Sequence, residues 1–181
     1  MNKTYTLNVA GVTRELPIIQ ISDSLCIASF VILGDTELVC AAAPELVIKL
    51  PSVDILVTAE AKGIPLVFEI SKLLNMKKYI VARKSIKPYM DCPIVNEVES
   101  ITTQKKQLLC LDKKDADDIK GKRVAIIDDV ISTGDSIQAV EDLVKKAGGQ
   151  VVAKAAILAE GSASERDDII YLEELPLFPL K

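Results

Sequence analysis

The sequence predicts an α/β protein in which a parallel sheet is flanked by helices. Residues 54–82 and 124–158 each contain an apolar run, a stretch with apolar residues on one helical face, and a second apolar run. Buried parallel strands are apolar almost throughout, and strand–helix–strand units join them by right-handed crossovers. With 181 residues, of which 49% are apolar, the chain is long enough for a complete core. We therefore expect a single domain over residues 1–181.

The first predicted element is a hairpin. Two β-rich runs, Thr4–Val9 and Val12–Ile18, flank an Ala-Gly pair that suits a tight turn. A helix is expected to follow, capped by Asp35 or Thr36 and extending to about residue 50. Because proline lacks the backbone N–H and clashes with the preceding turn, Pro44 predicts a break or a second start within this helix.

The two strand–helix–strand units follow, and a short strand lies near the end of the chain. Apolar residues recur at helical spacing in both predicted helices, and a Gly-Gly pair ends the second one. In chain order we expect a strand at Asp54–Ala59, a helix at Ile64–Asn75, strands at Tyr79–Ala82 and Val124–Ile127, a loop at Asp128–Asp135, a helix at Ser136–Ala147, and strands at Val151–Leu158 and Ile169–Leu172.

A long excursion separates the two units. Ser85–Leu111 contains two prolines and then two strand-like runs, Ile94–Thr103 and Gln107–Leu111, so we expect a loop that ends in a hairpin. Asp112–Arg123 is charged and polar, and is expected to be a solvated connection. Long insertions in a compact domain are usually functional or mobile, which makes residues 85–111 a candidate functional segment.

Composition narrows the chemistry that the chain can perform. There is no histidine, so the commonest general base and the commonest transition-metal ligand are both absent. Carboxylates, lysine, arginine, hydroxyls, backbone amides or a hard metal ion must therefore carry any reaction. The formal net charge of −4, the lack of tryptophan and the few other aromatic residues disfavour a nucleic-acid-binding role.

The four cysteines, Cys26, Cys40, Cys92 and Cys110, form no CxxC pair and have no histidine to join them, so structural zinc is not expected. We expect reduced, mostly buried thiols in a reducing compartment. The N-terminus lacks the apolar core of a signal peptide, and no run approaches the ~20 apolar residues of a membrane span. These observations predict a cytoplasmic protein with no membrane partner.

Residues 124–136, VAIIDDVISTGDS, carry the most specific chemical signal. Ligands of parallel α/β sheets bind at the carboxyl ends of the strands, where Asp128 and Asp129 are expected. Two adjacent acids accept hydrogen bonds from a vicinal diol, or ligate a hard cation. Gly134 lets the backbone approach a ligand, the first amides of the next helix face an anion, and Thr133 and Ser136 add hydroxyl donors. A phosphate beside a diol describes ribose 5-phosphate.

Three other interpretations of this segment are weaker. The acid pair of a receiver domain also follows an apolar strand, but that strand normally begins its domain, and here the pair begins at Asp128. Thr133, Asp135 or Ser136 alone would be an ordinary helix N-cap. A nucleoside triphosphatase would need a GxxxxGK[ST] loop, which the chain lacks.

The string VAIIDDVISTGDS resembles the signature of the type I phosphoribosyltransferase family, which is an apolar strand, two acids, a few small residues and Thr-Gly. Within that family the chain looks most like adenine phosphoribosyltransferases and their near relatives. Three further segments are similar to that group, and the resemblance covers about residue 44 to the C-terminus. These segments are Glu60-Ala61-Lys62-Gly63 after the first core strand, Ala82-Arg83-Lys84 with Lys87-Pro88 after the next strand, and YLEELPLF at residues 171–178.

The resemblance implies a fold and a set of contacts. The fold would be a type I phosphoribosyltransferase-like parallel sheet flanked by helices, with a small N-terminal hood in residues 1–34 over the base and a flexible lid in residues 85–111 that excludes water. Mg²⁺ would bridge oxygens of phosphoribosyl pyrophosphate, with Asp128 and Asp129 as its only candidate protein ligands. The implied contacts are Asp128 and Asp129 with the ribose hydroxyls, Ser132, Thr133, Gly134, Asp135 and Ser136 with the 5-phosphate, Ala61, Lys62 and Gly63 with pyrophosphate, and Arg83, Lys84 and Lys87 with pyrophosphate across a dimer interface.

A glutamate in the lid, near the base, is the catalytic residue that the resemblance implies. Glu99 is the nearest match and Glu97 the second, and the alternative is a solvated glutamate on an exposed strand. Surface charges beyond a strand end are likewise the alternative for Lys62, Arg83 and Lys84.

The expected reaction transfers the phosphoribosyl group of phosphoribosyl pyrophosphate to a purine base, giving a nucleoside monophosphate and pyrophosphate in purine salvage. Adenine is the favoured base, and xanthine, hypoxanthine and guanine are alternatives. Two residues depart from the family pattern, Lys62 for arginine and Asp135 for glycine. They weaken the assignment of adenine as the base more than they weaken the assignment of phosphoribosyl transfer. A non-catalytic regulator that senses phosphoribosyl pyrophosphate is the other candidate. The implied partners are the two substrates and a second copy in a homodimer, without nucleic acid.

Overall fold

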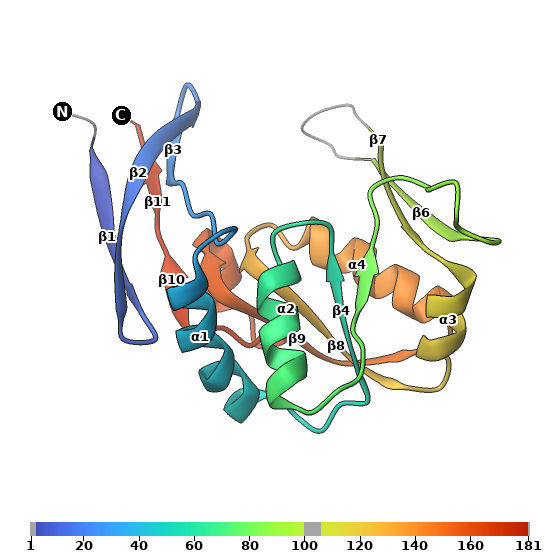
Figure 1. Cartoon of the computed structure of the whole chain (residues 1–181). Coiled ribbons are helices and arrows are strands. Elements are labelled where there is room, and N and C mark those ends of the chain that lie inside the picture. Colours follow the sequence, from blue (N-terminus) through green and yellow to red (C-terminus); the bar gives the residue numbers. More distant parts are fainter. Residues whose placement is uncertain (1–2, 100–105, 181) are drawn as a thin grey trace.

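A computed structural model describes residues 3–99 and 106–180, and its centre is a five-stranded parallel sheet (Figure 1). The strand order is β10-β9-β8-β4-β5, and every neighbouring pair runs parallel. The strands are β4 (Ile55–Ala59), β5 (Ile80–Ala82), β8 (Arg123–Ile131), β9 (Gln150–Glu160) and β10 (Glu173–Leu175). The prediction of an α/β fold with a parallel sheet is confirmed.

Helices cover both faces of this sheet because the strand side chains alternate between two apolar cores. Leu56 and Ile127 join the core under α1 (Thr36–Lys49) and α2 (Ile64–Leu73). Their neighbours Val57 and Ile126 point the other way, into the core with α3 (Lys113–Ile119) and α4 (Asp135–Lys146). Since both faces are covered, the continuous apolar strands of the sequence have a direct explanation.

A second sheet, called the hood sheet here, packs against the first core (Figure 1). It contains β1 (Thr4–Val9), β2 (Val12–Ser22), β3 (Leu25–Ala28) and β11 (Leu177–Pro179), all paired antiparallel. The predicted N-terminal hairpin is confirmed. The fourth strand comes from the far end of the chain, so the hood sheet is not N-terminal alone.

The predicted excursion ends in a hairpin of β6 (Ile94–Glu99) and β7 (Lys106–Leu111). This hairpin lies against α4, where the Asn96 side-chain amide donates to the Ala139 carbonyl at 3.2 Å and the Lys146 ammonium donates to Asn96 at 2.8 Å. The predicted continuation of the first strand to residue 103 lies outside the described residues.

Three predictions about individual helices and strands outside the site are wrong. Helix α1 runs through Pro44 without a break, since this proline is exposed and water can bond the carbonyl that it leaves free. The expected solvated connection contains α3, because Ala116 and Ile119 are spaced to bury one side of a short helix. The tail strand lies at β10 rather than at Ile169–Leu172, which meets β9 through a bridge from Ile170 to Ala155 and a hydrogen bond from the Leu172 N–H to the Ile157 carbonyl at 3.1 Å.

The cysteines are free thiols, as expected, but most of them are not buried. Cys110 is buried, Cys26 is half-buried, and Cys40 and Cys92 are exposed. Among the described residues, no helix is both long and apolar enough to cross a membrane.

Candidate functional site

A cleft of about 590 Å³ lies at the carboxyl ends of β4, β8 and β9. One wall is formed by the strand ends and the loops that follow them. The other wall is formed by residues 27–31, which leave the hood sheet, together with Leu175 of β10. The predicted site residues that line the cleft are Ala61, Lys62, Lys84, Asp128, Asp129, Ser132, Thr133, Asp135 and Ser136.

The two acids sit inside the last part of β8, which continues to Ile131. The predicted loop at Asp128–Asp135 is therefore wrong, because β9 extends beside β8 and pairs Asp128 with Ala156 and Ile131 with Ala159. Only three residues then separate the strand from α4. This short connection places the acid pair close to the start of the helix.

Asp129 presents a buried acceptor that no group in the described part of the chain satisfies. The residue is 4% exposed, and its Oδ2 atom has no hydrogen-bond partner there. The nearest cation is the Lys62 ammonium, at 3.6 Å from Oδ2. Buried polar atoms are almost always hydrogen-bonded, so an unsatisfied carboxylate oxygen facing a cleft indicates a place for a ligand donor.

Asp128 is the second acid of the pair, and it lies in direct contact with Asp129. The Asp129 backbone N–H donates to Asp128 Oδ1 at 2.9 Å. Burial and the neighbouring charge of Asp129 raise the pKa of the Asp128 carboxyl to about 7. The site therefore concentrates two acids where a hydroxyl donor or a cation would relieve their repulsion.

The loop before α4 forms an open cradle. Gly134 has a φ of 90°, in the left-handed region, and as the N-cap residue it offers no side chain to the first turn of α4. Among the described residues, only the Asp135 N–H of that turn has a side-chain acceptor, the Thr133 hydroxyl at 3.4 Å. The unpaired amides at a helix start attract anions. Thr133 donates its hydroxyl to Asp135 Oδ2 at 3.0 Å, so the extra carboxylate that departs from the family pattern is held beside the cradle.

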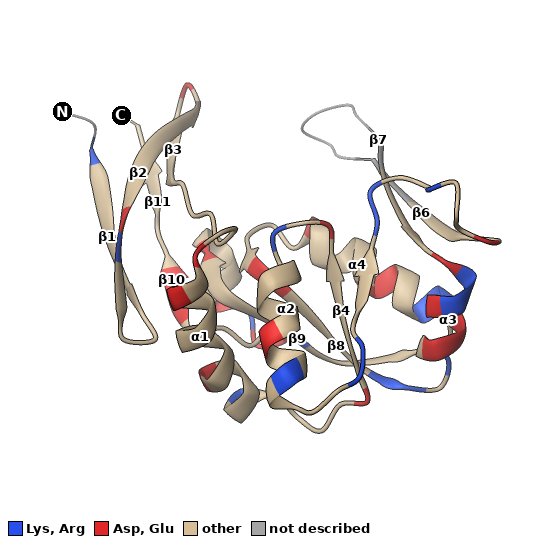
Figure 2. Ribbon diagram, viewed as in Figure 1, with Lys and Arg blue, Asp and Glu red and all other residues tan. Residues whose placement is uncertain are grey.

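A second loop, residues 60–63, joins β4 to α2 and faces the acids; Figure 2 shows acidic and basic residues together in this loop. The peptide bond between Glu60 and Ala61 is cis. The Glu60 carboxylate accepts from the Lys84 backbone N–H at 3.0 Å and from Arg83 Nε at 3.2 Å. These bonds tie the loop after β4 to the loop after β5.

The family model for the phosphoribosyl transferase domain matches residues 48–176 of the chain. The chain belongs to this family. The predicted resemblance is confirmed, and so is the family's fold, since the adenine phosphoribosyltransferase of Thermoanaerobacter pseudethanolicus matches with a TM-score of 0.65. That structure is 20% identical, and the match covers 94% of this chain and 95% of the other.

Two curated relatives of this phosphoribosyl transferase domain differ in the base that their names specify. The hypoxanthine/guanine phosphoribosyltransferase of Methanotorris igneus is 33% identical over 63% of this chain and 58% of its own length. The adenine phosphoribosyltransferase of Thermosipho africanus is 34% identical over 63% of this chain and 64% of its own length. The chain thus spans less than two thirds of either relative.

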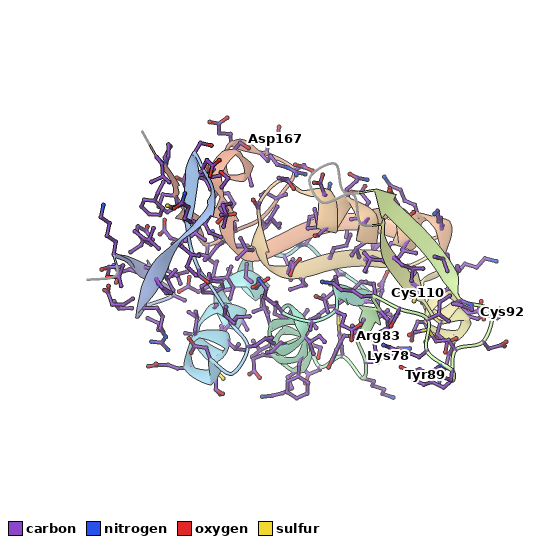
Figure 3. The ribbon with its side chains drawn as sticks, turned by 90° about the horizontal axis from the view of Figure 1, so that it is seen from above. Lys78, Arg83, Tyr89, Cys92, Cys110 and Asp167 are labelled. Atoms are coloured by element: carbon purple, nitrogen blue, oxygen red, sulfur yellow. The ribbon has the colours of Figure 1, made fainter. Side chains whose placement is uncertain are left out.

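The predicted basic residues of the transferase domain do not all meet at the cleft. Lys84 lines it, whereas Arg83 pairs with Glu60 and donates to the Tyr89 hydroxyl at 2.9 Å, away from the hood sheet (Figure 3). Lys87 donates to the Ser85 hydroxyl at 2.6 Å. Glu99 and Glu97 lie on β6, but their side chains are outside the described residues, so the lid glutamate stays a prediction.

Sequence reasoning missed several residues of this cleft. Residues 27–31 and Leu175 fall within the expected hood and the resembling segment 171–178, but neither is predicted as part of the site, because no local pattern connects them to the phosphate motif. Glu160, which also lines the cleft, ends β9 two residues beyond the predicted strand, so a longer strand would have placed it there. A further residue, Arg166, contacts the cradle from behind.

Replacing Gly63 by alanine is expected to disturb the cleft and to weaken binding of phosphoribosyl pyrophosphate, the ligand that the family resemblance implies. A methyl group on Gly63 would lie 2.2 Å from Thr58 Oγ1 and 3.1 Å from the Ile127 carbonyl oxygen, so loop 60–63 must shift away from the acids. Overpacking of this kind costs about 1–3 kcal/mol, or roughly 5–150-fold if it appears as lost affinity. Calorimetric titration measures the change, and Thr58→Ala in the Gly63→Ala background is expected to restore part of it. Wild-type affinity in Gly63→Ala alone would contradict the proposed close packing.

Proposed function

We propose that the protein transfers the phosphoribosyl group of phosphoribosyl pyrophosphate to a purine base, giving a nucleoside 5-monophosphate and pyrophosphate. The observation that carries this proposal is the buried, unsatisfied Asp129 oxygen beside a helix start whose N-cap is a glycine, in one cleft. A diol-binding acid pair next to a phosphate cradle fits ribose 5-phosphate. The names of the curated relatives support a purine acceptor.

The residues of the cleft suit this reaction. The bond from ribose C1 to the pyrophosphate oxygen breaks, a base nitrogen forms the new bond to C1, and the proton on that nitrogen passes to an acceptor, for which the lid glutamate is the predicted candidate. Lys62 and Lys84 line the cleft and would stabilise the negative charge of the departing pyrophosphate. Asp128 and Asp129 would hold the ribose hydroxyls while positive charge develops on the ring, as in glycoside hydrolysis.

Magnesium is proposed as the cofactor, carried by the substrate. Among residues 3–99 and 106–180, no three carboxylate or thiol groups gather to form a metal cage. Mg²⁺ commonly binds through one or two carboxylates plus substrate phosphates and water, which fits the Asp128–Asp129 pair and its unsatisfied oxygen. When bound, the ion would neutralise charge on the pyrophosphate.

The purine would occupy the part of the cleft next to the hood sheet. Ile27, Phe30 and Val31 line that wall and suit a flat, largely apolar ring. Adenine is the first base proposed, because the loops at residues 60–63 and 82–88 resemble those of adenine enzymes. Hypoxanthine and guanine follow, since relatives named for each kind are about equally similar.

A homodimer is part of the proposal. Beside Arg83, the exposed side chains of Ile86 and Tyr89 offer apolar surface that a second copy would cover, and Arg83 would then face the partner's pyrophosphate. Light scattering in solution measures the mass of the assembly.

One assay tests the activity. The protein is mixed with phosphoribosyl pyrophosphate, magnesium and adenine, hypoxanthine, guanine or xanthine in turn, and pyrophosphate release is measured. We expect release with at least one base, adenine first. Tight binding of phosphoribosyl pyrophosphate without release for any base would instead support a sensing role.

A further inference from the structure

Arg166 lies directly behind the phosphate cradle. A methyl group built on Gly134 would lie 2.2 Å from Nη1 of Arg166, so the guanidinium occupies the space that a larger residue at position 134 would need. Gly134 also has its left-handed φ of 90°. The left-handed backbone favours glycine at this position, and a side chain here would displace the end of the Arg166 guanidinium.

Three charged side chains fix the guanidinium in place. Arg166 donates from Nε and Nη2 to the two carboxylate oxygens of Asp168, both at 2.8 Å. Lys154 of β9 binds the same carboxylate at 2.7 Å and Glu141 of α4 at 2.9 Å. Lys154 and Glu141 are only 15% and 12% exposed, so this chain of ion pairs is partly shielded from water.

The arrangement leaves one end of Arg166 unused. Its Nε and Nη2 groups are bound to Asp168, while no hydrogen bond in the described part of the chain uses Nη1, the atom nearest Gly134. The hydrogen bond from Arg166, and then that from Lys154, lowers the pKa of Asp168, so the clamp stays charged at neutral pH. The cationic end of an Arg166–Asp168 ion pair, with its Nη1 donors free among the residues described, therefore lies against the loop that is proposed to bind phosphate.

We propose that Arg166 is a positioning residue for the 5-phosphate, an inference that rests on the proposed function. Its guanidinium supports the backbone at Gly134 and adds positive charge behind the first turn of α4. This charge offsets the carboxylate of Asp135, which the Thr133 hydroxyl holds beside the cradle and which by itself would repel a phosphate. The ion pairs to β9 and α4 keep the charge from swinging into solvent.

The test separates the phosphate cradle from the pyrophosphate part of the cleft. Arg166→Met is expected to weaken ribose 5-phosphate about tenfold, as loss of one nearby charge would, and to leave inorganic pyrophosphate within about twofold. In turnover, KM for phosphoribosyl pyrophosphate should rise by a similar factor with kcat little changed. Arg166→Lys keeps the positive charge but lacks the planar guanidinium that donates two parallel hydrogen bonds, so it should recover part of the affinity.

A matched control is Arg123→Met. Arg123 also forms a two-pronged pair, with Asp54 at 3.1 and 2.8 Å, but it starts β8 at the opposite end of the sheet. The Arg123→Met variant should lose this ion pair without any change in its affinity for ribose 5-phosphate or pyrophosphate. Thermal unfolding of each variant establishes that the fold is retained.

If Arg166→Met does not fold, Arg166→Gln provides the second test, because it keeps a polar side chain beside Asp168 but removes the positive charge. It should weaken ribose 5-phosphate about tenfold, again without affecting pyrophosphate. Equal losses for both ligands, or none for ribose 5-phosphate, would overturn the role of Arg166. A wild-type protein that binds neither ligand would overturn the proposed function itself, and the inference with it.

Discussion

Replacing Asp128 and Asp129 together by asparagine is expected to abolish measurable binding of phosphoribosyl pyrophosphate while the fold survives. Each ionised carboxylate accepts a charge-assisted hydrogen bond from a ribose hydroxyl in the proposed complex. Such bonds contribute about 1.5–3 kcal/mol each, so losing both lowers the affinity by roughly 10²–10⁴-fold. The Asp129 oxygen that the protein leaves unsatisfied should account for the larger share.

Isothermal titration of the double variant measures this loss, and circular dichroism checks the fold. The charge-matched control is Asp115→Asn with Asp118→Asn, which removes two acids that bind Lys78 beside α3, away from the cleft. The control should bind phosphoribosyl pyrophosphate like the wild type. Unchanged affinity in the cleft variant would remove the acid pair from the proposed mechanism.

Asp128→Asn alone is expected to raise the free energy of unfolding of the ligand-free protein at neutral and basic pH. Burial and the charge of Asp129 raise the pKa of Asp128 in the folded state. The folded protein therefore holds a proton that the unfolded chain has lost, and stability falls as pH rises from the unfolded pKa, near 4, through the folded one. Asparagine removes this penalty, so the gain should be about 1–3 kcal/mol at about pH 8 and smaller at about pH 5.

Urea denaturation of wild type and variant at these two pH values gives the difference. Asp54→Asn is the contrasting control, because hydrogen bonds from the Arg123 side chain and backbone lower the pKa of Asp54. That acid stabilises the fold at both pH values, so its removal should be destabilising at both. A stability gain for Asp128→Asn that does not grow with pH would contradict the raised pKa.

The parallel core and the phosphate cradle are the parts of this protein that local sequence patterns predict. The strands β4 and β8 are buried on both faces, so their apolar runs are continuous, and Gly134 must follow the acids because a left-handed turn starts α4. The predicted ends of helices and strands are wrong where tertiary contacts determine them. Pairing with β9 extends β8 through Asp128 and Asp129, and burial of Ile119 makes a helix of a strongly charged segment.

The rest of the site depends on residues that are distant in the chain. The hood wall at residues 27–31 and Arg166 reach the cleft only after the sheet has formed, and neither belongs to a recognisable motif. Arg83 is a different case. It matches a family segment, but its side chain binds Glu60 and Tyr89 instead of lining the cleft of its own chain, so its role at a dimer interface stays a prediction.

The pairing of β11 with β3 determines which strand forms the border of the hood sheet. Without β11, the strand β3 would be an open edge, and such edges can pair with other chains. The edge that β11 presents instead is only three residues long and contains Pro179, and short edge strands with proline resist such pairing. Residues 177–179 therefore blunt this border of the protein, and they hold in register the strand from which Ile27 and Ala28 line the cleft.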